Sequence, residues 1–427
     1  MPPSFAVSNF VGTFAFTKTP NPTSMTNKKL RTVDTNERNA YFWPFVLITS
    51  LFFLWGFAHS ILDVLNKHFQ NSMPGITKTE SAFVQAVVYG GYFLMALPAG
   101  NIIRRFGYRA GVLTGLVLYG IGALLFIPGG QLLSFPFFLL CLFIIGCGLT
   151  CLETAANPYV TVLGAPEKAE SRINLSQSFN GLGWICGPLV GGWFLFHDGG
   201  NIATPYAIIG VVVLLVAVVF SRVKLPEVEA GGADAAAADA VSTKLWHHRN
   251  FVMGLVALFL YVAAQTGINS FFINYVTEHA ALSDADAALL LSFGSMGLFM
   301  LGRMCGSWVM ARMPAPRVLL CCAAGAIAAM FVLLTGAGAM GVVAFFVCYL
   351  CESIMFPTIF ALAIKGLGGH TKRASSYLVM SIVGGAIAPV LMGLIADTVS
   401  MSAAFIVPLV CFIGVAVFAG SIRLRNA

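Results

Sequence analysis

The stretch Phe137-Phe-Leu-Leu-Cys-Leu-Phe-Ile-Ile-Gly-Cys-Gly-Leu-Thr-Cys-Leu-Glu153 decides the fold class, and it ends on a carboxylate. A transmembrane helix needs about 20 predominantly apolar residues, and this run with its continuation is long enough. An acid at the centre of a bilayer costs about 2.5–3.5 kcal/mol on insertion scales, so an acid at that depth indicates a functional site. A second acid, Asp63, lies within another long apolar run. The sequence therefore predicts a membrane protein with functional acids inside its spans.

The composition agrees with a polytopic membrane protein. Of the 427 residues, 58% are hydrophobic and 10% are charged, whereas soluble domains carry about 25% charged residues. The ten cysteines fall inside the apolar runs, so we interpret them as small buried residues and not as a disulfide framework. The pair Cys348-Tyr-Leu-Cys351 has no second pair in the sequence. We therefore expect neither a metal site nor a cofactor.

Apolar runs of about 18–25 residues recur along the chain, and a helix is the ordinary way to satisfy backbone polar groups in lipid. The sequence predicts an all-α membrane protein with twelve transmembrane helices. The expected spans are 43–66, 80–103, 110–128, 135–162, 171–196, 203–222, 250–277, 285–310, 316–337, 340–364, 374–396 and 402–421.

A long polar loop divides the chain into two bundles of six expected spans each. This loop contains Pro226 and the pair Gly231-Gly232, which favour irregular structure over a continued helix. The expected parts are a cytoplasmic N-terminal tail at 1–42, an N-terminal six-helix bundle at 43–222, a cytoplasmic linker at 223–249, a C-terminal six-helix bundle at 250–421 and a cytoplasmic C-terminus at 422–427.

The basic residues predict the orientation. If the N-terminus is cytoplasmic, all of the 24 Lys and Arg residues except Lys67, Lys78 and Arg303 lie on the cytoplasmic side. Cytoplasmic loops of membrane proteins carry such an excess of Lys and Arg. We therefore expect both termini in the cytoplasm. The same placement explains the net charge of +7 without a nucleic-acid partner.

The two bundles resemble each other in sequence. Glu153-Thr-Ala-Ala-Asn-Pro158 in the fourth span matches Glu352-Ser-Ile-Met-Phe-Pro357 in the tenth, and Asp63 aligns with Asn269. Parallel repeats of this kind place the substrate near the middle of the bilayer, between the two halves, with one half rocking on the other.

Four blocks resemble the fucose/galactose/glucose:proton symporter family of the major facilitator superfamily. The resemblance extends from about Tyr41 to the C-terminus. It implies twelve helices in two pseudo-symmetric bundles and sugar import together with a proton across the bacterial inner membrane. The blocks are Phe52-Phe-Leu-Trp55-Gly-Phe-Ala58, Cys151-Leu-Glu-Thr-Ala-Ala-Asn-Pro158, Leu175-Ser-Gln-Ser-Phe-Asn180 and Phe356-Pro-Thr-Ile-Phe-Ala-Leu362.

Asp63 is the candidate for proton coupling. His59 and Ser60 precede it by four and three residues, so the three side chains share one helix face. Intramembrane acids of this kind form proton relays in transporters, and the resemblance gives Asp63 that role. The alternative is an acid at the outer end of the span that is wetted by lipid headgroups, since Lys67 follows one turn later.

Glu153, Asn157, Gln177 and Asn180 are candidates for sugar binding. A carboxylate accepts hydrogen bonds and an amide both donates and accepts, so together they can bracket neighbouring sugar hydroxyls. The resemblance implies this role for all four residues and adds proton linkage for Glu153. The structural alternatives are a pair between Glu153 and Arg303 and hydrogen bonds between helices.

The polar faces of the first and seventh spans complete the predicted site. His59 and Ser60 lie in the first span; in the seventh, Gln265 is the counterpart of His59 and Asn269 that of Asp63. We predict that these four residues also contact the substrate. Glu352 repeats the position of Glu153, and a transport role and a structural pairing are both open for it.

The sequence therefore predicts a proton-coupled monosaccharide symporter, with L-fucose as the first candidate substrate. The alternatives are a galactose or glucose symporter of the same family, a sodium-coupled or facilitative carrier, and a sugar sensor that does not transport. The expected partners are the sugar, the proton and membrane lipid, with no nucleic acid, and we expect a monomer. HExxH, nucleophile-elbow and phosphate-loop motifs are absent from the sequence, so we do not expect an enzyme.

Overall fold

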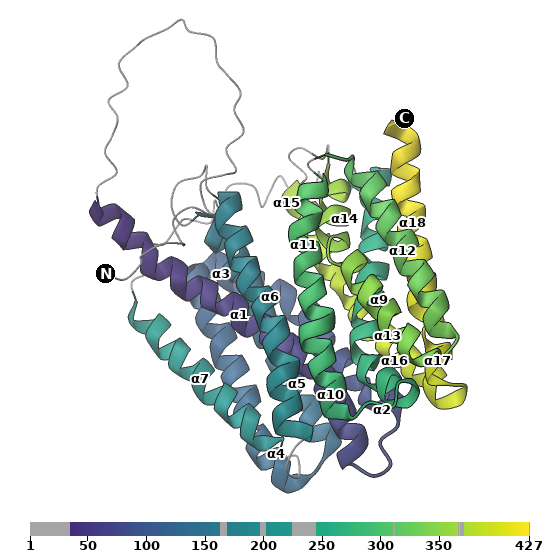
Figure 1. Cartoon of the computed structure of the whole chain (residues 1–427). Coiled ribbons are helices and arrows are strands. Elements are labelled where there is room, and N and C mark those ends of the chain that lie inside the picture. Colours follow the sequence, from purple (N-terminus) through teal and green to yellow (C-terminus); the bar gives the residue numbers. More distant parts are fainter. Residues whose placement is uncertain are drawn as a thin grey trace, which may run out of the picture. The chain divides into compact units, whose positions relative to one another are not determined.

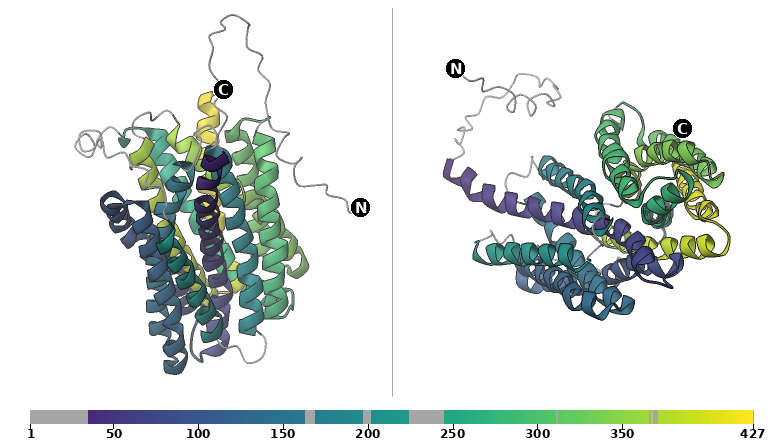
Figure 2. Two further views of the ribbon diagram at one scale, coloured as in Figure 1. Left: turned by 90° about the vertical axis from the view of Figure 1, so that its left-hand side faces the viewer. Right: turned by 60° about the horizontal axis from the view of Figure 1, so that its bottom comes forward.

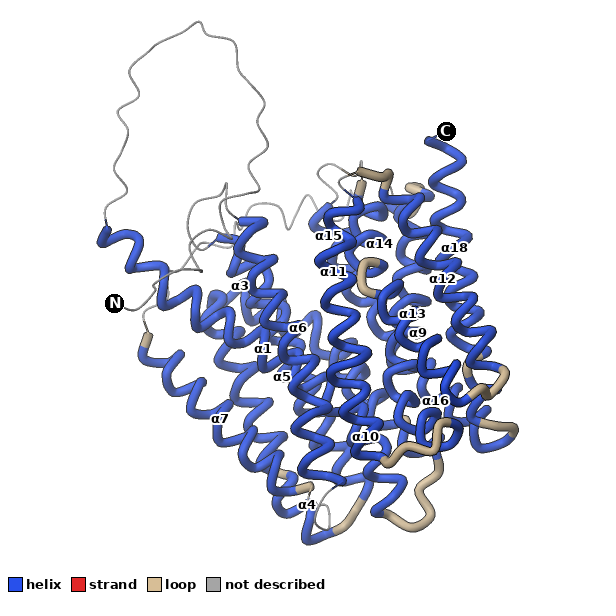
Figure 3. The backbone as a smooth tube through the Cα atoms, viewed as in Figure 1, coloured by secondary structure: helices blue, strands red, loops and turns tan. Residues whose placement is uncertain are grey.

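The computed structural model describes residues 35–162, 169–196, 202–223, 245–310, 312–365, 367 and 371–426. Within these ranges the backbone forms helices joined by short turns and forms no strand (Figure 3). Most of the predicted tail and most of the predicted linker lie outside the described residues. The helices are α1 Thr35–Ser72, α2 Lys78–Ser81, α3 Phe83–Leu124, α4 Phe126–Leu132, α5 Phe135–Val162, α6 Ala169–Phe196, α7 Ala203–Arg222, α9 Arg249–His279, α10 Asp284–Leu289, η2 Leu290–Met296, α11 Gly297–Met310, α12 Ala315–Leu334, α13 Gly338–Glu352, α14 Met355–Ile364, α15 Thr371–Met380, η4 Ser381–Val383, α16 Gly384–Thr398, α17 Met401–Ala404 and α18 Ile406–Asn426.

Twelve segments of the described chain are helical, long and apolar enough to cross a membrane, which confirms the predicted fold class. Several of these spans are built from more than one element. The tenth span, Gly338–Ile364, combines α13 and α14, and the eighth, Asp284–Gly306, runs through α10, the π-helical segment η2 and part of α11. Such interruptions are tolerated inside a membrane where protein groups satisfy the freed backbone.

The turn between the second and third spans depends on Gly107. Its φ of 82° and ψ of 171° lie in a region that residues with a side chain rarely adopt, and they separate the two helical parts of α3. A Cβ at this position would meet no atom within 4 Å. The requirement for glycine is therefore conformational and not a matter of space.

Helices α1 and α6 pack closely through small residues. Gly183, Gly187 and Gly191 of α6 face α1, where added Cβ atoms would meet atoms of the turns from Phe53 to Val64. Small residues spaced by four let two helix backbones approach each other. This approach places the polar faces of α1 and α6 beside each other.

The described helices from α1 to α7 and from α9 to α18 form two groups that touch along a shared boundary. Helices α2 and α3 contact α16, and α6 contacts α10 and η2. Figure 1 shows α2 near the end of α16, and Figure 2 shows the purple-to-teal and green-to-yellow helices as neighbouring groups. The predicted site residues come from helices on both sides of this boundary.

The packing of α6 on α1 predicts that two glycine substitutions affect thermal stability differently. At Gly187 a Cβ would lie 2.9 Å from the amide nitrogen of Ile61 and 3.0 Å from the carbonyl oxygen of Phe57. We expect Gly187→Ala to lower the free energy of unfolding by about 1–3 kcal/mol through overpacking. Gly90→Ala is the control, because a Cβ there meets nothing within 4 Å. Thermal unfolding in detergent should show a lower Tm for Gly187→Ala and an unchanged or higher Tm for Gly90→Ala; equal values would contradict this packing.

Candidate functional site

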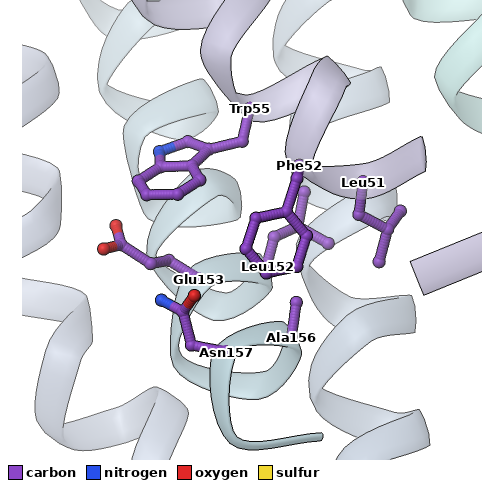
Figure 4. Close-up of a pocket in the computed structure, with 7 residues that line it drawn as sticks. All are labelled: Leu51, Phe52, Trp55, Leu152, Glu153, Ala156 and Asn157. Carbon is purple, nitrogen blue, oxygen red and sulfur yellow. The ribbon is translucent and has the colours of Figure 1, made fainter. Parts of the chain in front are cut away.

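A hollow between α1 and α5 brings Glu153 together with an indole ring and an amide. Its volume is only about 10 Å³, far below the roughly 300–1,000 Å³ of typical ligand pockets, so it must widen to admit a sugar. In Figure 4 the carboxylate of Glu153 and the amide of Asn157 lie on the same side of α5, with the ring of Trp55 near the carboxylate. The lining residues are Leu51, Phe52, Trp55, Leu152, Glu153, Ala156 and Asn157.

Aromatic side chains surround His59 beside this hollow. The His59 Nε2 atom lies 3.0 Å from the hydroxyl oxygen of Tyr92, and its ring stacks on Trp184 with centroids 6.0 Å apart. The Tyr92 hydroxyl also lies within reach of the Glu153 carboxyl group. Trp55 completes the edge of the cluster, since its ring meets that of His59 at 6.2 Å. The predicted site residues His59 and Glu153 are thus linked through Tyr92.

Asp63 lies one turn further along α1, and its side chain is buried. It is 2% exposed, which argues against an acid wetted at the end of its span. Gln85 of α3 donates a hydrogen bond of 2.8 Å to its Oδ1 atom. The Oδ2 atom has no hydrogen-bond partner among the described residues. A buried carboxyl oxygen without a partner is costly unless it carries a proton or gains a ligand.

The amides of α6 divide into two kinds. Gln177 is half-buried, and its Nε2 atom approaches the Oδ1 atom of Asn157 at 3.5 Å, on the same helix face as Glu153. Asn180 is 5% exposed and donates to the backbone carbonyl of Phe52 at 3.1 Å. Gln177 and Asn157 are therefore grouped with the carboxylate, whereas Asn180 joins α6 to α1.

Three further predicted residues lie among hydrogen bonds or packing between helices. The Ser60 hydroxyl donates to the carbonyl of Gly183 at 3.2 Å, where α1 and α6 pack. The Oδ1 atom of Asn269 accepts a hydrogen bond of 2.7 Å from the Tyr349 hydroxyl. Gln265 lies one turn before Asn269 on α9 and is half-buried. In this conformation the Ser60 hydroxyl and the Asn269 Oδ1 atom form hydrogen bonds within the protein.

Glu352 and Arg303 lie where the tenth span is interrupted, between the end of α13 at Glu352 and the start of α14 at Met355. Glu352 ends α13 and is fully buried; its Oε1 atom accepts from the Cys348 thiol at 3.3 Å. Because Pro357 has no N–H, the carbonyl of Ser353 loses its helical partner, and Arg303 Nε donates to that carbonyl at 3.3 Å. Arg303 therefore satisfies a backbone group at the break, in agreement with a structural role for this arginine.

The comparisons with known proteins establish the family. The sequence model of the family described as "Major Facilitator Superfamily" matches residues 41–381 of this chain. The chain belongs to the major facilitator superfamily. The L-fucose-proton symporter of Escherichia coli (strain K12) is 35% identical over 427 residues, which cover 93% of this chain and 97% of that protein. The glucose/galactose transporter of Brucella abortus biovar 1 (strain 9-941) is 34% identical over 404 residues, which cover 92% and 97%.

A solved structure of the superfamily has a similar fold. The crystal structure of the transporter FucP in its outward conformation is 36% identical and superposes with a TM-score of 0.68, covering 89% of this chain and 98% of that chain. The chain is therefore a multi-pass membrane protein of the superfamily. The predicted resemblance to the fucose and glucose/galactose branch is confirmed.

The sequence did not point to two side chains that contact the buried acids Asp63 and Glu153. Gln85 is 2% exposed and bonds Asp63, and Tyr92 is 6% exposed and joins His59 to Glu153. Gln85 stands in the apolar run Ala82-Phe-Val-Gln85-Ala-Val-Val88, where a lone amide needs a partner within the protein. That signal was available. Tyr92 gave none, because tyrosine is common in transmembrane helices.

The two amides of α6 predict different consequences of truncation. Asn180→Ala removes a buried hydrogen bond that joins α6 to the Phe52 carbonyl of α1, so we expect the free energy of unfolding to fall by about 1–3 kcal/mol. Gln177→Ala removes a half-buried amide with one long contact, so stability should stay within about 0.5 kcal/mol of the native protein. Thermal unfolding in detergent without ligand checks both. A larger loss of stability for Gln177→Ala than for Asn180→Ala would contradict this division.

Proposed function

We propose that this chain is a proton-coupled monosaccharide symporter, with L-fucose as its first candidate substrate. The single observation that carries the proposal is the cluster of Glu153, Asn157 and Gln177 beside an aromatic wall, and the buried acid Asp63 lies on the same side of α1 as His59. The aromatic wall consists of Trp55, His59, Tyr92 and Trp184. The names of the relatives support it, since one is an L-fucose-proton symporter and another is a glucose/galactose transporter. The chain is a transporter in this proposal and not an enzyme.

The polar groups at the hollow match what a sugar presents. Glu153 accepts hydrogen bonds from hydroxyl groups, and the amides of Asn157 and Gln177 donate and accept. The buried Trp55 Nε1 atom lies within reach of the Tyr92 hydroxyl, and in the proposal a sugar oxygen replaces that hydroxyl as its acceptor. The rings of Trp55 and His59 offer apolar faces for the C–H side of the sugar ring. Glu153 is thus the central sugar-binding residue of the proposal.

Asp63 is the proton carrier of the proposal. A charged carboxylate would be expensive in the closed states of the transport cycle, because it would then be buried without a counter-charge. Binding of a proton removes this cost, so a protonated Asp63 permits the halves to rock while a charged one opposes it. Gln85 holds one carboxyl oxygen and leaves the other available to the proton.

The remaining predicted residues support the same cycle. Ser60 and Asn180 join α1 to α6 within the N-terminal half, and Asn269 joins α9 to α13 within the C-terminal half, so in the proposal a sugar must replace these bonds to contact the three residues. Gln265 faces the substrate path from α9 in the proposal. We further propose two six-helix bundles at 43–222 and 250–421, with both termini cytoplasmic, in a monomer of the bacterial inner membrane.

A galactose or glucose symporter is the second candidate, because the Brucella abortus transporter is nearly as similar as the Escherichia coli symporter. Both candidates share the site, the proton coupling and the alternating access. They differ in which hydroxyl groups the Glu153 cluster must reach. Measured uptake distinguishes them.

Uptake of a panel of labelled sugars tests the proposal. Proteoliposomes with the full chain receive an imposed pH gradient and labelled L-fucose, D-galactose, D-glucose or N-acetylglucosamine. We expect accumulation of at least one sugar above its external concentration, lost when a protonophore collapses the gradient and unaffected by sodium. Liposomes without protein are the control. Sodium-dependent uptake, uptake that stops at equal concentrations, or binding without uptake would each contradict proton symport, and they would indicate a sodium-coupled carrier, a facilitative carrier or a sensor respectively.

A further inference from the structure

The two halves touch at the end of the bundle that carries α2, and the contact centres on Asp397. This residue lies in the last turn of α16, in the C-terminal half. Its Oδ1 atom accepts from the backbone N–H of Lys78 at 3.1 Å, and its Oδ2 atom accepts from the N–H of Thr79 at 2.8 Å and from the Thr79 hydroxyl at 2.6 Å. Both carboxylate oxygens are therefore engaged by one turn of the N-terminal half.

The donors are prepared by the local sequence. Thr77 and Glu80 form a capping box, in which the Thr77 hydroxyl accepts from the Glu80 N–H at 3.1 Å and the Glu80 carboxylate accepts from the Thr77 N–H at 2.9 Å. This pairing fixes the turn and leaves the N–H groups of Lys78 and Thr79 pointing outward. A carboxylate is the natural partner for such groups, since hydrogen bonds to an ionised acceptor are the stronger kind.

A glycine on α16 allows this approach. Gly393 lies one turn before Asp397, and a Cβ there would be 2.7 Å from the Lys78 carbonyl oxygen and 2.7 Å from the Thr79 Cα atom. The backbones of α16 and α2 are thus in direct contact. This observation is independent of the hydrogen bonds and supports the same contact.

Other polar pairs join the halves at the same end. Lys78 Nζ lies 2.6 Å from the Glu278 carboxylate, and Asn71 donates to Asp284 at 2.5 Å. Deeper in the bundle, Asn66 donates to the carbonyl of Ser270 at 3.1 Å. Asn66 lies less than one turn beyond the buried acid Asp63, so the joined surface begins directly beside the proposed proton carrier.

We propose that Asp397 and the turn Thr77–Glu80 form a latch that holds the two halves together at the α2 end and that must release when this end opens. The inference rests on the proposed transport cycle, in which α2 lies on the outer side of the membrane. The latch carboxylate is exposed to solvent, and exposed charged contacts contribute little each. Such contacts release readily, as a contact that opens in every cycle requires.

The distance between the halves tests the latch without any sugar. Fluorophores attached through unnatural amino acids at Pro74 and Leu282, in exposed loops of the two halves, report this distance by single-molecule energy transfer in nanodiscs. The native protein should show mainly the short distance. We expect Asp397→Ala to raise the ratio of long to short populations roughly 3- to 10-fold, the effect of losing one set of partly exposed hydrogen bonds.

Asp286→Ala is the matched control, because this acid lies at the same end but accepts from Ser283 of its own helix start at 2.7 Å. It should leave the ratio unchanged. Thr79→Val removes one of the three bonds and should shift the ratio in the same direction by less, which keeps the test decisive if Asp397→Ala does not fold. Unchanged ratios in folded Asp397→Ala or Thr79→Val protein would overturn the latch. A native protein that shows the latch but accumulates no sugar would instead contradict the proposed function.

Discussion

The burial of Asp63 is the constraint on which the rest of the structure depends. Lipid provides neither water nor counter-ions, so a carboxyl group 2% exposed inside a span must be partnered, protonated or transiently wetted. The fold meets part of this demand with Gln85 and leaves one oxygen without a partner among the described residues. An acid in that condition is a natural site for a coupled proton.

The packing around Asp63 serves two needs at once. Toward the middle of α1, close contact with α6 brings Glu153, Asn157 and Gln177 near an aromatic wall that contains His59. Toward the other end, Asn66 and the latch at Asp397 join the two halves. Asp63 therefore lies between the proposed sugar site and the surface that must separate, so the charge on one residue can influence both.

Much of this architecture follows from the sequence, because lipid allows few solutions. Apolar runs of spanning length must become helices, and the deep acids Asp63, Glu153 and Glu352 stand out against them. The partners of these acids do not follow in the same way. That Gln85 contacts Asp63 and that Asn180 faces a backbone carbonyl depend on the rotation of each helix about its axis, which only the packing of neighbours determines. The break at Glu352 and its satisfaction by Arg303 likewise require the structure, although Pro357 marks the place.

The most direct measurement compares two modes of transport in proteoliposomes that contain Asp63→Asn protein. One mode is uphill accumulation of the sugar identified by the uptake panel, driven by an imposed pH gradient; the other is exchange of that sugar at equal pH on both sides. We expect the variant to lose uphill accumulation and to keep exchange. The asparagine amide is neutral like protonated Asp63, but it cannot bind and release a proton. Glu153→Gln should weaken both modes. Uphill accumulation of the sugar by Asp63→Asn protein would contradict the central role of this acid.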